Sequence, residues 1–151
     1  MQSMETNTAE IVGSPAPSFA LSGTADVSLA DFRGKSPVLI YFMREFACHT
    51  CLHHVLEIVK DYDRIQKQGV EVLVIGGGNV DTAKRFAARY KIPFTVLADP
   101  SHSVYDQYGL DKAFGVWQKS GSYLIDVDGV VRYAKSAGKP SAGLDLSAIP
   151  F

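Results

Sequence analysis

The two stretches that decide the fold are Pro37-Val38-Leu39-Ile40-Tyr41-Phe42 and, shortly after it, Cys48-His49-Thr50-Cys51. The first is apolar throughout, which is typical of a central strand that is covered on both faces. From residue 48 to residue 68 the apolar positions instead recur at helical spacing, in a stripe made of Leu52, Val55, Leu56, Val59 and Tyr62. The sequence therefore predicts a buried strand and then an amphipathic helix that starts at the two cysteines and ends at Gly69.

The segments on either side of this unit also alternate between strand and helix. We predict strands at 27–29, 70–75 and 94–97, helices at 80–90 and 101–108, and a closing hairpin of 122–127 and 130–134 around Asp128-Gly129. This order indicates an α/β fold with a mostly parallel central sheet, helices on both faces and a C-terminal antiparallel hairpin. We expect residues 1–11 to be a disordered tail and 12–151 to be one domain, whose last segment, 139–151, is a poor helix former because it contains Gly143 and Pro150.

Composition limits the classes of function. The chain has 151 residues, 21% of them charged, with a formal net charge of −1, so its overall charge does not attract nucleic acid or anionic lipid. The first eight residues lack the basic and apolar segments of a signal peptide, and no apolar run approaches the roughly 20 residues of a membrane span. We therefore expect a cytoplasmic protein whose partners are small molecules or other proteins. In that compartment two cysteines at this spacing favour redox work or metal binding over a structural disulfide.

The placement of the cysteines favours redox chemistry. Cys48 and Cys51 are three positions apart, so in the first turn of a helix their side chains are neighbours and can close a disulfide with little movement. The helix N-terminus carries a partial positive charge that favours thiolate over thiol, and Arg44 and His49 add positive character nearby. A reactive thiolate with a second thiol one turn away is what reversible thiol–disulfide exchange requires.

Other interpretations of these residues are weaker. The cysteines could be inert apolar residues, or could bind a metal with His53 or His54, but a closed structural site needs a fourth ligand, so we expect no metal and no cofactor. His53 and His54 are themselves expected on the exposed surface of the helix. The glycine run Gly76-Gly77-Gly78-Asn79 lacks the Lys-Ser/Thr of a phosphate-binding loop and is interpreted as a strand-to-helix connection.

The chain resembles the peroxiredoxin-like branch of the thioredoxin superfamily, the alkyl hydroperoxide reductase and thiol-specific antioxidant group. The matching pieces span roughly residues 12–134 and comprise 12–19, 29–35, the strand leading to 44–51, 98–100 with 105–110, and 123–129. The resemblance implies a thioredoxin-like fold and an antioxidant enzyme that reduces hydroperoxides. It implies a reversible Cys48–Cys51 disulfide, reset by an external thiol such as thioredoxin or glutathione.

The sequence departs from this family at the site. The family places Thr or Ser three residues before the peroxidatic cysteine and Pro seven residues before it. With Cys51 as that cysteine, Cys48 occupies the Thr place and Arg44 the Pro place, while the family's second arginine falls at Ser120. Ser120 also stands where thioredoxins have a cis-proline. We hypothesise that Arg44 supplies the missing guanidinium to a peroxide oxygen.

Several alternatives remain open at this point. The resemblance names Cys51 as the nucleophile, whereas the helix-end argument favours Cys48, because Cys51 lies one turn deeper beside Leu52 and Val55, where burial raises a thiol pKa. A protein disulfide reductase and a non-enzymatic redox-sensing module are the alternative functions. The oligomeric state is open, with a homodimer as the form we consider.

Overall fold

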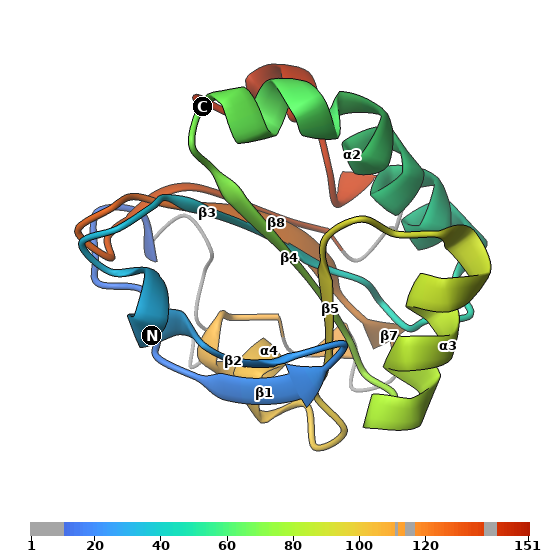
Figure 1. Cartoon of the computed structure of the whole chain (residues 1–151). Coiled ribbons are helices and arrows are strands. Elements are labelled where there is room, and N and C mark those ends of the chain that lie inside the picture. The colour runs from blue at the N-terminus through green and yellow to red at the C-terminus, as the bar shows by residue number, and fades with distance from the viewer. Residues whose placement is uncertain (1–10, 111, 114–116, 138–141) are drawn as a thin grey trace, which may run out of the picture.

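A computed structural model describes residues 11–110, 112–113, 117–137 and 142–151 (Figure 1). Its strands are β1 (Ala20–Gly23), β2 (Asp26–Ser28), β3 (Val38–Phe42), β4 (Glu71–Gly76), β5 (Thr95–Ala98), β6 (Lys112–Ala113), β7 (Trp117–Gln118), β8 (Ser120–Ile125) and β9 (Val131–Ala137). Its helices are α2 (His49–Lys67), α3 (Val80–Tyr90) and α4 (Ser103–Gln107), with short 3-10 turns η1 (Leu29–Phe32) and η3 (Leu146–Ala148).

One seven-stranded sheet organises the molecule, in the order β2-β1-β5-β4-β3-β8-β9. The three central strands β5, β4 and β3 are parallel, and β3 pairs antiparallel with β8, which forms the predicted C-terminal hairpin with β9. On the other edge, β1 and β2 form a second antiparallel hairpin. The predicted α/β class and thioredoxin-like fold are confirmed, and the sheet is mixed because it has a hairpin on each side of its parallel centre.

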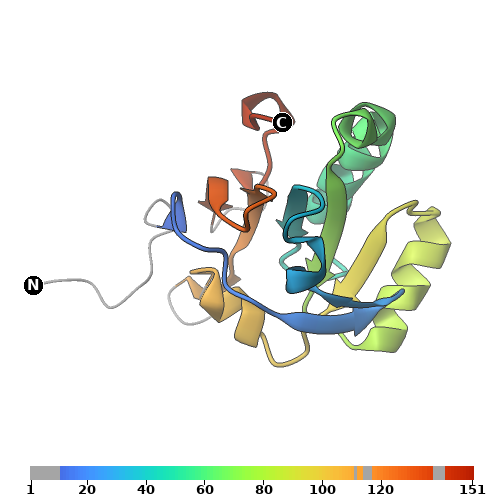
Figure 2. The ribbon, with the colours of Figure 1, turned by 60° about the vertical axis from the view of Figure 1, so that its left-hand side comes forward.

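The central strand β3 separates two apolar cores by simple alternation. Leu39, Tyr41 and Met43 belong to the core under α2 and α3, while Ile40 and Phe42 belong to the core on the opposite face, with α4 and η1. Figures 1 and 2 show α2 and α3 together on one side of the sheet and α4 on the other. Both faces of β3 are thus covered, which is why its sequence is apolar without interruption.

The predicted element bounds agree with the structure to within one or two residues, except that β9 runs three residues beyond its predicted end at 134. β1 was not predicted, and residues Leu29–Phe32 form the short 3-10 turn η1. The tail expected at residues 1–11 lies outside the described residues except for Ile11, which is 8% exposed and packs into the α4-side core. Gly69 ends α2 with φ +77°, the left-handed conformation that glycine adopts readily.

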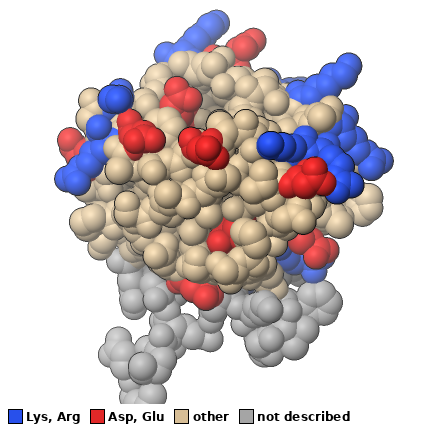
Figure 3. All heavy atoms as spheres, turned by 60° about the horizontal axis from the view of Figure 1, so that its bottom comes forward, with Lys and Arg blue, Asp and Glu red and all other residues tan. Residues whose placement is uncertain are grey.

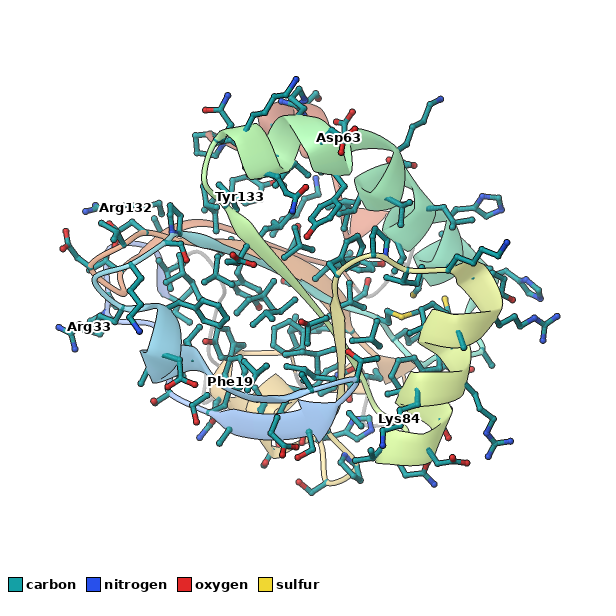
Figure 4. All side chains as sticks on the ribbon, in the orientation of Figure 1. Phe19, Arg33, Asp63, Lys84, Arg132 and Tyr133 are labelled. Carbon is teal, nitrogen blue, oxygen red and sulfur yellow. The ribbon has the colours of Figure 1, made fainter. Side chains whose placement is uncertain are left out.

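The C-terminal segment packs on α2 without forming an α-helix in its described part. Leu144 and Ile149 are buried in the core under α2, and the Arg64 guanidinium of that helix lies over the Phe151 ring at 5.5 Å. The side chains labelled in Figure 4 divide in the same way, with Tyr133 on the α2 side of the sheet and Phe19 on the α4 side. Residues 142–151, the described part of the segment with the weak helix signal, thus pack onto the core.

The surface carries both signs of charge. On the face seen in Figure 3, basic side chains lie toward the top and the two sides, whereas acidic side chains also lie in the middle of the face. None of the helices in the described part of the chain combines the length and apolar character that crossing a bilayer demands.

Candidate active site

The two cysteines lie at the start of α2, in the crevice at the carboxyl end of β3, where open α/β sheets usually bind their ligands. Cys48 is the N-cap of α2, with extended backbone (φ −73°, ψ 116°), and its Sγ accepts a hydrogen bond from the Cys51 backbone N–H at 3.3 Å. A sulfur in the place usually taken by a Ser or Asp oxygen thus satisfies one of the free N–H groups of the helix. The positive end of the helix dipole therefore lies at this sulfur.

Cys51 lies inside the first turn and faces the sheet. It is 0% exposed, and its Sγ accepts a hydrogen bond from the Arg44 backbone N–H at 3.3 Å. Burial, followed by the neighbouring Cys48 thiol, raises the pKa of Cys51 to about 12, although the Arg44 N–H opposes this rise. Both cysteines are reduced in this structure, and Cys51 is therefore a thiol at neutral pH.

Cys48 borders a cleft of about 490 Å³ between the start of α2 and α3. Figure 4 shows sulfur atoms in this region, between the two helices. The cleft is lined by Phe46, Ala47, Cys48, His49, Leu52, Thr82, Arg85, Phe86, Arg89 and Tyr90. Aromatic rings and cations therefore surround the Cys48 side of the motif, while Cys51 lies behind it in the core.

The structure brings the four sequence-predicted site residues to this one place, but in different ways. His49 is exposed and lines the cleft beside Cys48. Arg44 contacts Cys51 through its backbone N–H, and its side chain, 25% exposed, lies 3.9 Å from the Glu45 carboxylate. A proline, which the family has at this place, has no N–H to donate, so the departure at Arg44 supplies a hydrogen bond to Cys51.

Two cations of the cleft, Arg85 and Arg89, were not identified from the sequence. They lie four residues apart on α3. Arg85 forms an ion pair with Asp81, and Arg89 lies over the Tyr90 ring at 5.4 Å. Both arginines line the cleft because α2 begins beside this edge of α3. The spacing of residues within α3 does not reveal that α2 lies there, so the sequence pattern could not place them in the cleft.

The expectation that His54 is exposed was wrong. His54 is 6% exposed, and its Nδ1 lies 2.9 Å from the Tyr41 hydroxyl oxygen. Its position three residues after Cys51 on an amphipathic helix was the available signal, because that spacing places both side chains on one face. His53 is exposed, as predicted.

Two aromatic residues fix the loop between β3 and α2. The Tyr105 hydroxyl lies 2.6 Å from the Met43 carbonyl oxygen and 3.2 Å from that of Ile75, so it joins the ends of β3 and β4. The Phe46 ring lies against Gly76, where a Cβ atom would meet it at 2.4 Å. The glycine run after β4 thus makes room for the active-site loop.

Ser120 lies beside the end of β3, since its neighbour Gly121 pairs with Phe42. It is 1% exposed. None of the peptide bonds in the described ranges, including that of Ser120, is cis. The same part of the chain contains no group of three or more His, Cys, Asp and Glu side chains arranged to hold a metal ion.

Residues 12–134 match the family model described as AhpC/TSA family. The chain belongs to this family. It is 35% identical over 125 residues to "Peroxiredoxin Q, chloroplastic" of Oryza sativa subsp. japonica, covering 80% of this chain and 57% of that protein. It is 33% identical over 142 residues to "Peroxiredoxin Bcp" of Escherichia coli (strain K12), covering 89% and 90%. The chain thus spans between about half and two thirds of the length of its plant relatives.

Solved structures show the same fold. "Peroxidoxin BcpB" of Mycobacterium tuberculosis matches with a TM-score of 0.77 at 18% identity, over 87% of this chain and 90% of that one. A putative thiol:disulfide interchange protein, DsbE, from Chlorobium tepidum matches with a TM-score of 0.69 at 28% identity, over 82% and 83%. These neighbours combine one fold with two kinds of thiol chemistry.

Proposed function

We propose that this domain is a thiol-dependent peroxidase, an antioxidant enzyme that reduces hydroperoxides through a Cys48–Cys51 disulfide. The observation that carries the proposal is the division between the two sulfurs: Cys48 borders the cleft at the positive end of α2, and Cys51 lies buried one turn behind it. Membership of the AhpC/TSA family and the similarity to proteins named peroxiredoxin support it.

The cycle uses the protein's two thiols and an external thiol, and it requires no cofactor. The Cys48 thiolate attacks the hydroperoxide, the O–O bond breaks, and the leaving oxygen takes a proton to become an alcohol or water while Cys48 becomes a sulfenic acid. The Cys51 sulfur then displaces the hydroxyl group from Cys48 as water and forms the disulfide. Two equivalents of an external thiol, of the thioredoxin or glutathione class, reduce this disulfide and are themselves oxidised.

The cleft fits an organic hydroperoxide better than hydrogen peroxide alone. Phe46, Phe86 and Tyr90 offer apolar surface for an organic group, while the cations around Cys48 stabilise negative charge that develops on the leaving oxygen. We further propose that the enzyme works in the cytoplasm, whose reducing thiols reset the disulfide, and that it forms a homodimer, which sedimentation of the full chain tests.

Stopped-flow oxidation of the reduced protein by hydrogen peroxide, an organic hydroperoxide and a small disulfide tests the proposal. We expect the organic hydroperoxide to react fastest, and two thiols to be lost with each equivalent. A disulfide that reacts faster than both peroxides would instead assign the domain to protein disulfide reduction. The similarity to the putative interchange protein from Chlorobium tepidum favours that second candidate, as do two cysteines within one helical turn. Turnover with excess reductant distinguishes either enzyme from a redox sensor, which is oxidised once.

A further inference from the structure

Three buried side chains behind the cleft form a continuous set, and the cycle above uses only one of them. Tyr41 and Cys51 are 0% exposed and His54 is 6% exposed. Cys51 and His54 lie three residues apart on the inner face of α2, and Tyr41 of β3 faces the same core. The Tyr41 hydroxyl lies 2.9 Å from His54 Nδ1, and the two rings meet edge to face at 5.6 Å.

Tyr41 and Cys51 belong to the same buried cluster under α2, so the Tyr41 hydroxyl lies between two titratable neighbours. Burial is the largest cause that raises the pKa of Tyr41 above its usual range, and Cys51 raises it further. Tyr41 in turn lowers the pKa of Cys51, but burial and Cys48 outweigh this effect. With a pKa of about 12, roughly one Cys51 side chain in 10⁵ is ionised at pH 7. A resolving thiol in this state needs a base at the moment of reaction.

We propose that Tyr41 and His54 form a proton relay that deprotonates Cys51 as it attacks Cys48. The S–H proton of Cys51 moves to the Tyr41 oxygen while the Tyr41 O–H proton moves to His54 Nδ1, so neither phenolate nor free thiolate accumulates. The Cys51 sulfur forms the S–S bond, and the leaving group departs from Cys48. His54 must be neutral with its Nδ1 unprotonated at the start. It returns its proton to solvent afterwards, so the net products in the peroxidase cycle are disulfide and water.

The relay acts through Cys51 and therefore serves any leaving group on Cys48. In the peroxidase cycle, where it rests on the proposed function, the leaving group is hydroxide. In thiol–disulfide exchange it is the thiolate of a mixed disulfide on Cys48. The second reaction tests the relay without a peroxide.

The experiment mixes reduced protein with one equivalent of 5,5′-dithiobis(2-nitrobenzoate) and follows the release of the coloured thiolate. The first release reports attack on the reagent by Cys48, and the second reports attack by Cys51 on the mixed disulfide. We expect His54→Gln, which keeps a polar side chain but cannot take up a proton, to slow the second release about a hundredfold. The first release should stay within about twofold. Tyr41→Phe should have the same effect, and His53→Gln, on the exposed side of α2, is the matched control.

A purely structural role for His54 predicts other results. The second release of the wild-type protein should be slower in D₂O than in H₂O. Its rate should depend on the deuterium fraction as expected when two protons are transferred in the rate-limiting step. His54→Gln should abolish that dependence. Unchanged second release in folded His54→Gln and Tyr41→Phe would overturn the relay, as would a wild-type second release without a solvent isotope effect. The solvent isotope effect is measured on the wild-type protein, so it tests the relay even where a substitution prevents folding.

The same variants treated with an organic hydroperoxide separate the two proposals. Failure of the hydroperoxide to oxidise the thiols of the wild-type protein would refute the peroxidase function and leave the relay to be judged on the mixed disulfide. Sulfenic acid that forms normally but persists in His54→Gln supports both.

Discussion

Cys48 and Cys51 lie one helical turn apart and are both buried, at 5% and 0% exposed, yet only Cys48 borders the cleft. Its neighbours there include His49, Arg85 and Arg89, whereas Cys51 lies deeper in the core that the two cysteines share. The difference arises from backbone conformation: Cys48 is an N-cap with extended backbone, outside the helical screw, so its side chain does not follow the face that Cys51 occupies. Two residues at i and i+3 thus face different environments, one suited to attack and one to resolution.

The largest expected effect is in alkylation. We expect iodoacetamide to modify Cys48 at pH 7 at least about a thousandfold faster than Cys51, because the thiolate is the reacting form and Cys51 is a buried thiol with a pKa of about 12. As the pH rises toward that value, the rate at Cys51 should increase about tenfold per pH unit. Peptide mapping by mass spectrometry measures both rates, with the denatured chain as control. Similar rates at the two cysteines of the folded protein would remove the distinction between them.

A smaller effect should come from the cations of the cleft. Replacing both Arg85 and Arg89 by Met should slow the reaction of Cys48 with the dianionic reagent 5,5′-dithiobis(2-nitrobenzoate) about tenfold at low salt, because attraction to the reagent is lost. The reaction with the neutral disulfide 4,4′-dithiodipyridine should stay within about twofold. Lys84→Met, an exposed position on the same helix outside the cleft lining, is the control. An equal loss of rate with both reagents would mean that replacing the arginines disturbs the fold of the site and not the attraction to the charged reagent.

The smallest effect is expected at Arg44. Its contact with Cys51 is made by the backbone N–H, which Met retains, so Arg44→Met should change the rate of hydroperoxide reduction by less than about threefold. Stopped-flow kinetics with an organic hydroperoxide measure it. A loss of about a hundredfold, typical of a removed electrostatic donor at a reacting atom, would establish the guanidinium role inferred from the family resemblance.

Local patterns predicted most of the fold because each central element is determined by its own residues. The apolar run of β3, the helical period of α2 and the Asp128-Gly129 turn each specify one element, and each element was found where it was expected. The predicted stripe of α2 is turned from the face that is buried: of its residues Val55 is buried and Leu56 is exposed, and the buried positions are Cys51, His54, Val55, Ile58 and Ile65. The place of the cysteines followed from the same elements. What failed depended on neighbours distant in the chain: His54 is buried because Tyr41 provides a partner across the core, and Arg85 lines the cleft because α2 begins beside α3.

Comparison with the family is limited in the same way at the site, because it matches residues without showing their contacts. It matches Cys48 to a threonine and Arg44 to a proline, but alignment alone does not reveal that the Arg44 N–H binds the Cys51 sulfur or that Cys48 caps α2. Those contacts depend on how the loop held by Phe46 and Tyr105 sets the end of β3 against the helix.

The most direct test of the central claim identifies the sulfur that attacks the hydroperoxide. Cys48→Ser and Cys51→Ser are each treated with an organic hydroperoxide in the presence of a sulfenic-acid trap, and the adduct is located by mass spectrometry. We expect an adduct at Cys48 in the Cys51→Ser protein and almost none in the Cys48→Ser protein, because of the two cysteines only Cys48 borders the cleft. An adduct that forms only at Cys51, in the Cys48→Ser protein, would contradict this claim.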